Sequence, residues 1–92
     1  MTGTVLKNLE IVNEKGLHAR ASAKFVEMVE KYDATAQVSK DGLTASGDSI
    51  MGLLMLAASR GTFIGVLTKG PQAGALAEAL ETLLAERFGE PM

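Results

Sequence analysis

The sequence contains no cysteine and only one histidine among its 92 residues. The lack of cysteine excludes disulfide bonds, thiolate metal sites and a thiol nucleophile. It also fits a reducing compartment, so we expect a cytoplasmic protein. One histidine without cysteine cannot build an ordinary structural zinc site. We therefore expect neither a bound metal ion nor another cofactor.

Aromatic residues are scarce as well, and no basic patch is visible. Phe, Tyr and Trp make up 4% of the chain, and nine basic residues are outnumbered by eleven acidic ones, for a net charge of −2. A nucleic-acid-binding protein normally combines a basic patch with aromatic side chains for stacking. Nucleic acid is therefore not expected as a partner.

Long apolar segments are missing too. The longest apolar run, residues 50–58, is too short to span a bilayer. The first four residues contain no apolar segment of the kind that a signal peptide needs. We therefore expect no membrane partner, and a single domain over residues 1–92 with one hydrophobic core.

Strand and helix patterns alternate along the chain. Residues 5–12, 34–38, 43–45 and 62–68 have the pattern of strands, and Asp41-Gly42 marks a tight hairpin turn. Helical periodicity covers residues 18–32, 49–58 and 73–88, and Gly89 and Pro91 are typical of a helix end. The order β-α-β-β-α-β-α predicts an α+β domain with helices on one face of an antiparallel sheet. The first and third helices should turn one apolar face each toward the core: Ala21, Phe25, Met28, Tyr32, Leu76, Leu80, Leu83 and Leu84.

The single histidine lies where a strand pattern ends and a helical pattern begins, in Gly16-Leu17-His18-Ala19-Arg20. Unpaired N–H groups and the helix dipole favour a negative charge at such a point. Arg20 adds a guanidinium that matches phosphate, Gly16 permits a sharp turn, and Leu17 is apolar enough to anchor the loop. The segment therefore predicts an anion site with a nucleophile at its centre. The alternative is that His18 is an exposed capping residue.

The chain offers no machinery for taking a phosphoryl group from a small molecule. It has no Gly-rich loop of the Walker form with its phosphate-positioning lysine, and no second histidine to act as a base. A carrier that receives a phosphoryl group from one protein and passes it to another fits these limits.

The segment Gly-Leu-His-Ala-Arg resembles the active-site segment of HPr, the phosphocarrier of the bacterial phosphoenolpyruvate-dependent phosphotransferase system. The resemblance extends from about Leu9 to the end of the third helical pattern. It implies an open-faced β-sandwich, in which four antiparallel strands carry three helices on one side. It also implies a monomer that is not an enzyme. Many members have proline directly after the arginine, whereas this chain has Ala21, which is compatible with a helix.

The resemblance also implies roles for individual residues. His18 would be phosphorylated on Nδ1 by enzyme I and would pass the phosphoryl group to an enzyme IIA-type acceptor. Arg20 would help to hold or release the group. The backbone amides of Ala19 and Arg20 would help to receive it.

Ser49 in Gly47-Asp48-Ser49-Ile50-Met51-Gly52 is the second position of interest. Structurally it is typical of a helix N-cap. In many HPr proteins, the matching serine is phosphorylated by HPr kinase/phosphorylase. This leaves open a second function, an HPr-like regulatory adaptor controlled through Ser49.

The helix expected at residues 49–58 carries more apolar residues than one buried stripe requires. Some of them must lie exposed or contact a partner, and flexible methionines suit a surface that meets several partners. The residues that match the HPr docking patch are Ile50, Met51 and Leu54.

The charge on the first helix bears on the choice of partner. Glu27 and Glu30 bring negative charge to a helix where sugar-transport members often carry lysines. This disfavours strongly acidic acceptor domains and leaves open the nitrogen-type regulatory branch. A small-molecule-binding module with a related architecture is a third hypothesis, but no residues point to a polar pocket.

Overall fold

Four strands and three helices alternate along the chain in the order that the sequence predicts. The computed structural model describes residues 3–92; Met1 and Thr2, part of the segment considered for a signal peptide, lie outside this range. The elements are β1 (Gly3–Glu10), α1 (Ala19–Glu30), β2 (Thr35–Lys40), β3 (Leu43–Ser46), α2 (Ile50–Met55), β4 (Phe63–Gly70), α3 (Ala73–Ala85) and a short 3-10 turn η1 (Arg87–Gly89).

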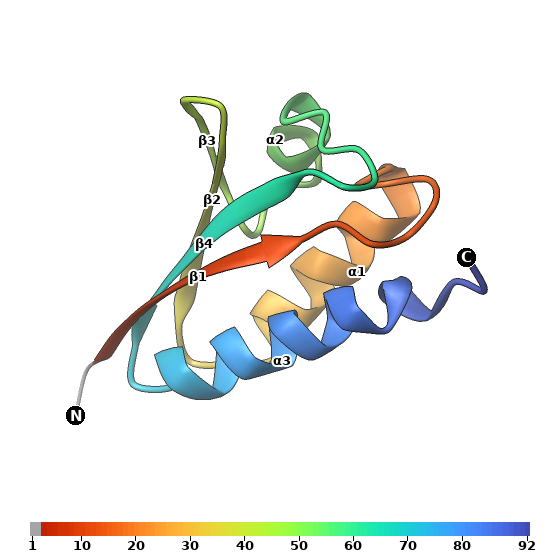
Figure 1. The fold of residues 1–92 in the computed structure, drawn as a ribbon. Helices are drawn as coiled ribbons and strands as arrows, with labels where there is room; N and C mark the ends of the chain where they lie inside the picture. The colour runs from red at the N-terminus through yellow and green to blue at the C-terminus, as the bar shows by residue number, and fades with distance from the viewer. Residues whose placement is uncertain (1–2) are drawn as a thin grey trace.

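The four strands form one antiparallel sheet in the order β1-β4-β2-β3. Its register brings Leu9 opposite Ile64 and Val38 opposite both Val66 and Ala45, so buried residues share one face. The other face carries exposed residues, among them Leu6 and Phe63. This is the open-faced α+β sandwich expected from the sequence, and Figure 1 shows α1 and α3 crossing the covered face.

All three helices contribute to the same core. Phe25 of α1, Leu53 of α2 and Leu76 of α3 are fully buried and belong to one cluster with the inward side chains of the sheet. Burial of side chains of this size stabilises the fold by about 1.5–3 kcal/mol each. Met28, Tyr32 and Leu83, expected on core faces, are only partly buried because they lie along the seam between α1 and α3.

The turn between β2 and β3 follows the sequence signal. Asp41 and Gly42 both have positive φ, 50° and 83°, which is the backbone of a type I′ hairpin. This turn matches the right-handed twist of the two strands that it joins.

All three helices are shorter than the sequence patterns predict. α1 begins at Ala19 and ends at Glu30, so His18 is its N-cap and Tyr32 lies beyond it. α2 ends at Met55, shorter than the expected range 49–58, because Ala57 has a left-handed φ of 51°. α3 ends at Ala85 rather than at residue 88, because Arg87 and Phe88 also have left-handed φ values, 57° and 55°.

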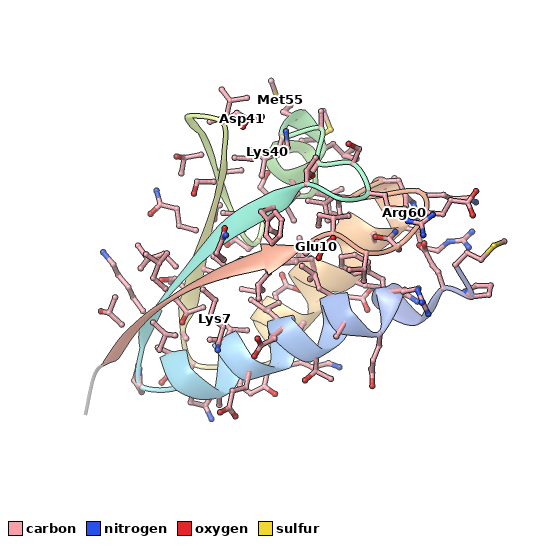
Figure 2. All side chains as sticks on the ribbon, viewed as in Figure 1. Lys7, Glu10, Lys40, Asp41, Met55 and Arg60 are labelled. Atoms are coloured by element: carbon pink, nitrogen blue, oxygen red, sulfur yellow. The ribbon has the colours of Figure 1, made fainter. Side chains whose placement is uncertain are left out.

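The strand boundaries shifted by one or two residues. β1 spans Gly3–Glu10 instead of residues 5–12, and β4 continues to Gly70. Figure 2 shows Lys7 of β1 lying against α3, where its Nζ is 3.3 Å from the Glu81 carboxylate. An exposed pair of this kind contributes about 0–1 kcal/mol. Within residues 3–92, no helix is both long enough and apolar enough to cross a membrane.

Candidate functional site

The loop that ends at His18 is held against the segment after α2. Gly16 has a φ of +69°, and a Cβ there would lie 2.5 Å from the carbonyl oxygen of Ala58. The N–H of Leu17 donates to that same carbonyl at 2.9 Å, and the Leu17 side chain is buried, as expected of an anchor. The Ser22 hydroxyl of α1 donates to the Leu17 carbonyl. Glycine is therefore required at position 16 by both backbone angle and space.

His18 is the N-cap of α1, and its two ring nitrogens have different surroundings. Nδ1 accepts a hydrogen bond from the Arg20 backbone N–H at 3.3 Å, so this nitrogen faces the start of the helix. The side chain is 27% exposed, which leaves it accessible to a partner protein. Nδ1 is therefore the nitrogen that lies where the helix favours negative charge.

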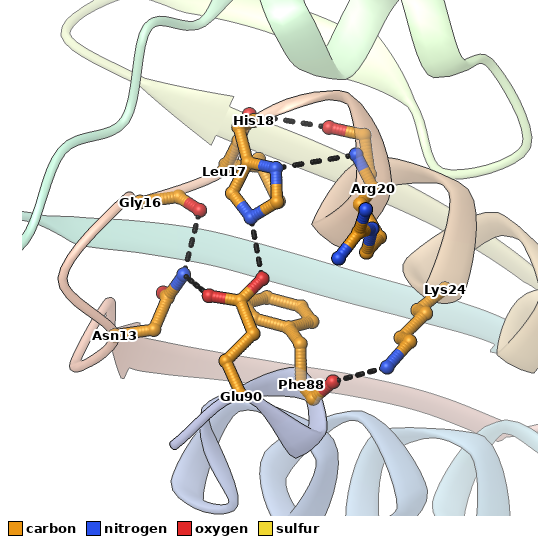
Figure 3. Close-up of polar contacts among 9 residues, drawn as sticks. Asn13, Gly16, Leu17, His18, Arg20, Lys24, Phe88 and Glu90 are labelled. Atoms are coloured by element: carbon orange, nitrogen blue, oxygen red, sulfur yellow. Dashed lines mark hydrogen bonds and ion pairs between the residues drawn. The ribbon is translucent and has the colours of Figure 1, made fainter. Parts of the chain in front are cut away.

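The other ring nitrogen contacts the end of the chain. Figure 3 shows the Glu90 carboxylate beside His18, where Glu90 Oε2 and His18 Nε2 share a hydrogen bond. Glu90 Oε1 accepts from Nδ2 of Asn13 at 3.0 Å, and Asn13 Nδ2 also donates to the Gly16 carbonyl at 2.8 Å. Both N–H bonds of the Asn13 amide are thus used within the site.

Asn13 is fully buried, and its Oδ1 accepts no hydrogen bond from any residue in the range 3–92. A buried acceptor without a partner costs about 1–3 kcal/mol. Turning the amide over would relieve nothing, because Oδ1 would then face the Gly16 carbonyl and the Glu90 carboxylate. The amide orientation is therefore fixed by its two acceptors.

The surroundings of Glu90 favour its charged form. Burial alone raises the pKa of this carboxyl. The hydrogen bonds from Asn13 and His18, together with the charges of His18 and Lys15, outweigh burial and bring the pKa below its ordinary value of 4.5. Glu90 is therefore a carboxylate at neutral pH.

A left-handed turn after α3 brings Glu90 to the histidine. Phe88 is buried despite its left-handed backbone, and its carbonyl accepts a hydrogen bond from Lys24 Nζ at 2.6 Å. Lys24 is half-buried and links α1 to this turn. We call residues 87–90 the C-terminal hook.

Sequence reasoning missed both Asn13 and Glu90. Asn13 directly follows the strand pattern of residues 5–12 and belongs to no motif. Glu90 is 72 positions from His18, next to residues read only as a helix stop. No local sequence signal could have paired them.

Three residues predicted for the anion site lie on one cleft together with Glu90, which was not predicted. His18, Ala19, Arg20 and Glu90 line one open cleft of about 490 Å³, whose other walls are Glu14, Lys15, Pro91 and Met92. Arg20 is exposed at its edge. Ala21 is buried in the first turn of a regular helix, so the absence of proline has not disturbed α1. Within residues 3–92, no three His, Cys, Asp or Glu side chains form a group that could hold a metal ion.

α2 lies beside this cleft. Ser49 is its N-cap, and the Ser49 hydroxyl accepts from the Gly52 N–H at 3.0 Å, as the sequence predicts. Ile50 and Met51 are exposed, while Leu54 is half-buried and lines a second hollow together with His18. Met55, which was not assigned to the docking patch, is the most exposed of these apolar side chains at 74%.

A family model described as "PTS HPr component phosphorylation site" matches residues 5–86. The chain belongs to the HPr family. Phosphocarrier protein HPr of Neisseria meningitidis is 42% identical over 84 residues, covering 91% of this chain and 94% of the relative. HPr of Pseudomonas aeruginosa is 40% identical over 83 residues, covering 89% and 92%.

Solved HPr structures share the fold. HPr-C-His from Thermoanaerobacter tengcongensis superimposes with a TM-score of 0.90 at 33% identity, covering 96% of this chain and 99% of that one. HPr from Bacillus anthracis gives a TM-score of 0.84 at 34% identity, covering 89% and 98%. As an HPr-family member, the chain is a phosphocarrier protein of the phosphotransferase system and not a catalyst. The family match ends at residue 86 and therefore includes His18 but not Glu90.

Proposed function

We propose that this HPr-family protein accepts a phosphoryl group on Nδ1 of His18 from phosphorylated enzyme I and passes it to an enzyme IIA-type acceptor. The observation that carries this proposal is the position of Nδ1, 3.3 Å from the Arg20 N–H at the start of α1. A phosphoryl group bonded there would have its oxygens against the N-terminal amides of the helix, around Ala19 and Arg20. The exposed Arg20 guanidinium would supply further charge-assisted hydrogen bonds.

In this reaction the Nδ1 lone pair attacks phosphorus and forms the new N–P bond. The bond between phosphorus and the donor breaks, and its electron pair leaves with the donor. The N-terminal amides of α1 and the Arg20 guanidinium stabilise the negative charge on the phosphoryl oxygens. Phosphoryl transfer is usually assisted by such prepositioned groups. Return transfer runs through the same contacts in reverse.

The partner would dock over Ile50, Met51 and Leu54, and we add Met55 to this patch because of its exposure. Support comes from the hollow that Leu54 shares with His18, since a protein seated on α2 would then reach the histidine. An apolar patch with methionines suits successive docking of two different partners.

The experiment is incubation with enzyme I and phosphoenolpyruvate, followed by analysis of the phosphate on the chain. We expect an acid-labile, base-stable phosphate on the wild type and none on His18→Ala, with similar thermal unfolding of the two proteins. Labelling of His18→Ala, or no labelling of folded wild type, would refute the proposal. Unfolding of His18→Ala would instead indicate a structural histidine, and direct phosphohistidine analysis of the wild type would then decide.

A regulatory role through Ser49 is the second candidate. Ser49 is only half-buried, and its hydroxyl caps α2 beside the docking patch. A phosphate there would add negative charge to an apolar surface that must lose water on docking. Incubation with HPr kinase/phosphorylase would test this, with Ser49→Ala as the control. The exposed Glu27 and Glu30 on α1 disfavour docking to a strongly acidic sugar-type acceptor and leave open the nitrogen-type regulatory branch. The monomeric state and the cytoplasmic location are further predictions.

A further inference from the structure

Both nitrogens of His18 have hydrogen-bond partners, and the two partners require the same protonation pattern. Glu90 is a carboxylate, which can only accept, so Nε2 must carry the proton in their hydrogen bond. The Arg20 backbone N–H can only donate, so Nδ1 must offer a lone pair. The neutral imidazole that satisfies both contacts is the Nε2–H tautomer, in which Nδ1 carries no proton and keeps the lone pair that a nucleophile needs.

We infer that Glu90 is a positioning residue: through its contact with Nε2, it holds His18 in the Nε2–H tautomer and stabilises the positive ring that forms when Nδ1 is phosphorylated. The first part stands on the geometry alone, whereas the second part rests on the proposed function. Residue 90 lies beyond the part of the chain that the family model matches, so the role inferred for Glu90 rests on the contacts of this structure.

The change in ring charge on phosphorylation explains why Glu90 would stabilise the phosphorylated histidine. The neutral ring attacks through Nδ1 while Nε2 keeps its proton, so the imidazole gains one positive charge as the N–P bond forms. The Glu90 carboxylate already lies against Nε2–H and stabilises this charge without moving. An orienting carboxylate acts on a catalytic histidine in the same way when that histidine becomes charged.

Asn13 makes the arrangement specific to a carboxylate. Its two N–H bonds go to the Gly16 carbonyl and Glu90 Oε1, and its buried amide cannot turn over without placing Oδ1 against both acceptors. One carboxylate oxygen of Glu90 thus accepts a hydrogen bond from Asn13, and the other accepts one from His18. An amide side chain at position 90 could accept from only one of them.

No neighbouring charged group replaces Glu90 at Nε2. Lys15 and Arg20 line the same cleft but carry only donors, and Lys24 is engaged with the Phe88 carbonyl. Glu14 also lines the cleft but is exposed, and the contact with Nε2 is made by Glu90.

Glu90→Gln therefore tests the tautomer role of Glu90 more directly than Glu90→Ala does. With its oxygen toward Asn13, the glutamine would turn its NH₂ group toward Nε2 and donate to it, which favours the opposite Nδ1–H tautomer. Glu90→Ala merely removes the contact. Glu86→Gln is the matched control, because Glu86 is an exposed glutamate at the end of α3 on the seam toward Met28.

The first measurement is ¹⁵N NMR of the imidazole nitrogens at about pH 9, well above the ordinary histidine pKa of about 6.5. The single histidine makes the assignment unambiguous. We expect Nε2–H in the wild type and in Glu86→Gln, and the largest Nδ1–H population in Glu90→Gln, with Glu90→Ala between them. The same tautomer ratio in all four proteins would overturn the inference.

The second measurement is the rate of phosphoryl transfer from enzyme I. We expect Glu90→Gln and Glu90→Ala to lower it about 10- to 100-fold, the range known for the outer partners of metal-bound histidines, and Glu86→Gln to leave it unchanged. A shifted tautomer with a normal rate would refute the stabilising role and leave the tautomer role intact. If the wild type itself accepts no phosphate, the proposed function fails, and the NMR result still decides whether Glu90 positions the ring.

Discussion

Lys24 on α1 donates a hydrogen bond from Nζ to the main-chain carbonyl of Phe88, 2.6 Å away, and so joins the helix that His18 caps to the hook that carries Glu90. The two residues are separated by 64 positions in the sequence. The lysine therefore acts on the site through the hook, by holding the segment that carries Glu90.

Replacing this lysine should loosen the hook. Lys24→Met keeps most of the apolar stem but removes the donor, and we expect the free energy of unfolding to fall by about 1.5–3 kcal/mol, as for a hydrogen bond to a charged group. Urea denaturation would measure it, with exposed Lys31→Met on the same stretch of chain as the control. An equal effect of the two substitutions would show that the contact with Phe88 adds nothing.

Arg20→Ala should impair transfer while leaving stability nearly unchanged, because the side chain is exposed. Loss of one charge-assisted contact to the phosphoryl group is expected to cost about 1.5–3 kcal/mol in its binding. Quench-flow rates in both directions, compared with Lys31→Ala, would measure the loss. Normal rates in both directions would identify Arg20 as a solvated charge.

Ser49→Asp should weaken docking to enzyme I without unfolding the domain. Aspartate is an acceptable N-cap, so α2 should persist, but its charge would lie beside Ile50 and Met51. Calorimetric titration with enzyme I would compare it with Ser39→Asp, which places the same charge on the open face of the sheet. Equal affinities for wild type and both variants would refute a charge-controlled switch.

Glu27→Lys with Glu30→Lys should speed transfer to an acidic sugar-type acceptor, and the gain should shrink as salt rises. Both glutamates are exposed on α1, and charges at the rim of an interface mainly alter association rates. Stopped-flow rates at low and high salt would test this. The control combines Glu78→Lys on α3 with Glu86→Lys at the C-cap of α3, and it changes the net charge equally. If it has the same effect, overall charge and not position is responsible.

Glu90 should make stability depend on pH in the acid range. Its pKa is lower in the folded protein than its ordinary value, chiefly because hydrogen bonds and nearby positive charges outweigh the effect of burial. The resulting stabilisation is present above the ordinary pKa and is lost as pH falls through the folded one. The difference in unfolding free energy between wild type and Glu90→Gln should therefore shrink below about pH 4.5. A difference that is constant from pH 7 to about pH 3 would contradict the lowered pKa.

Local signals allowed much of the fold to be predicted. The Asp41-Gly42 turn, the Ser49 cap and the turn at Gly16 each depend on one residue and its immediate neighbours, and all three were confirmed. The helix ends were harder to predict. At Ala57 and at residues 87–88 the chain adopts left-handed backbone without glycine, against the local preference of L-residues. In the second case the Phe88 side chain is buried in the core.

The two contacts of His18 also differ in whether the sequence could predict them. The contact of Nδ1 with the start of α1 follows from the sequence order of His18 and Arg20. The contact of Nε2 with Glu90 depends on where α3 ends, how the hook turns and what the buried Asn13 holds. Pairing of residues so far apart could not be found from periodicity or motif spacing.

The position of the hook also makes the two ends of the polypeptide unequal as attachment points. Pro91 and Met92 form part of the wall of the cleft that contains His18, whereas β1 begins at the opposite end of the sheet (Figure 1). An affinity tag or fluorescent protein fused after Met92 would crowd the histidine, and a polyhistidine tag would add imidazoles beside it. Fusions placed before Gly3 should leave the imidazole spectrum and the approach of a partner undisturbed.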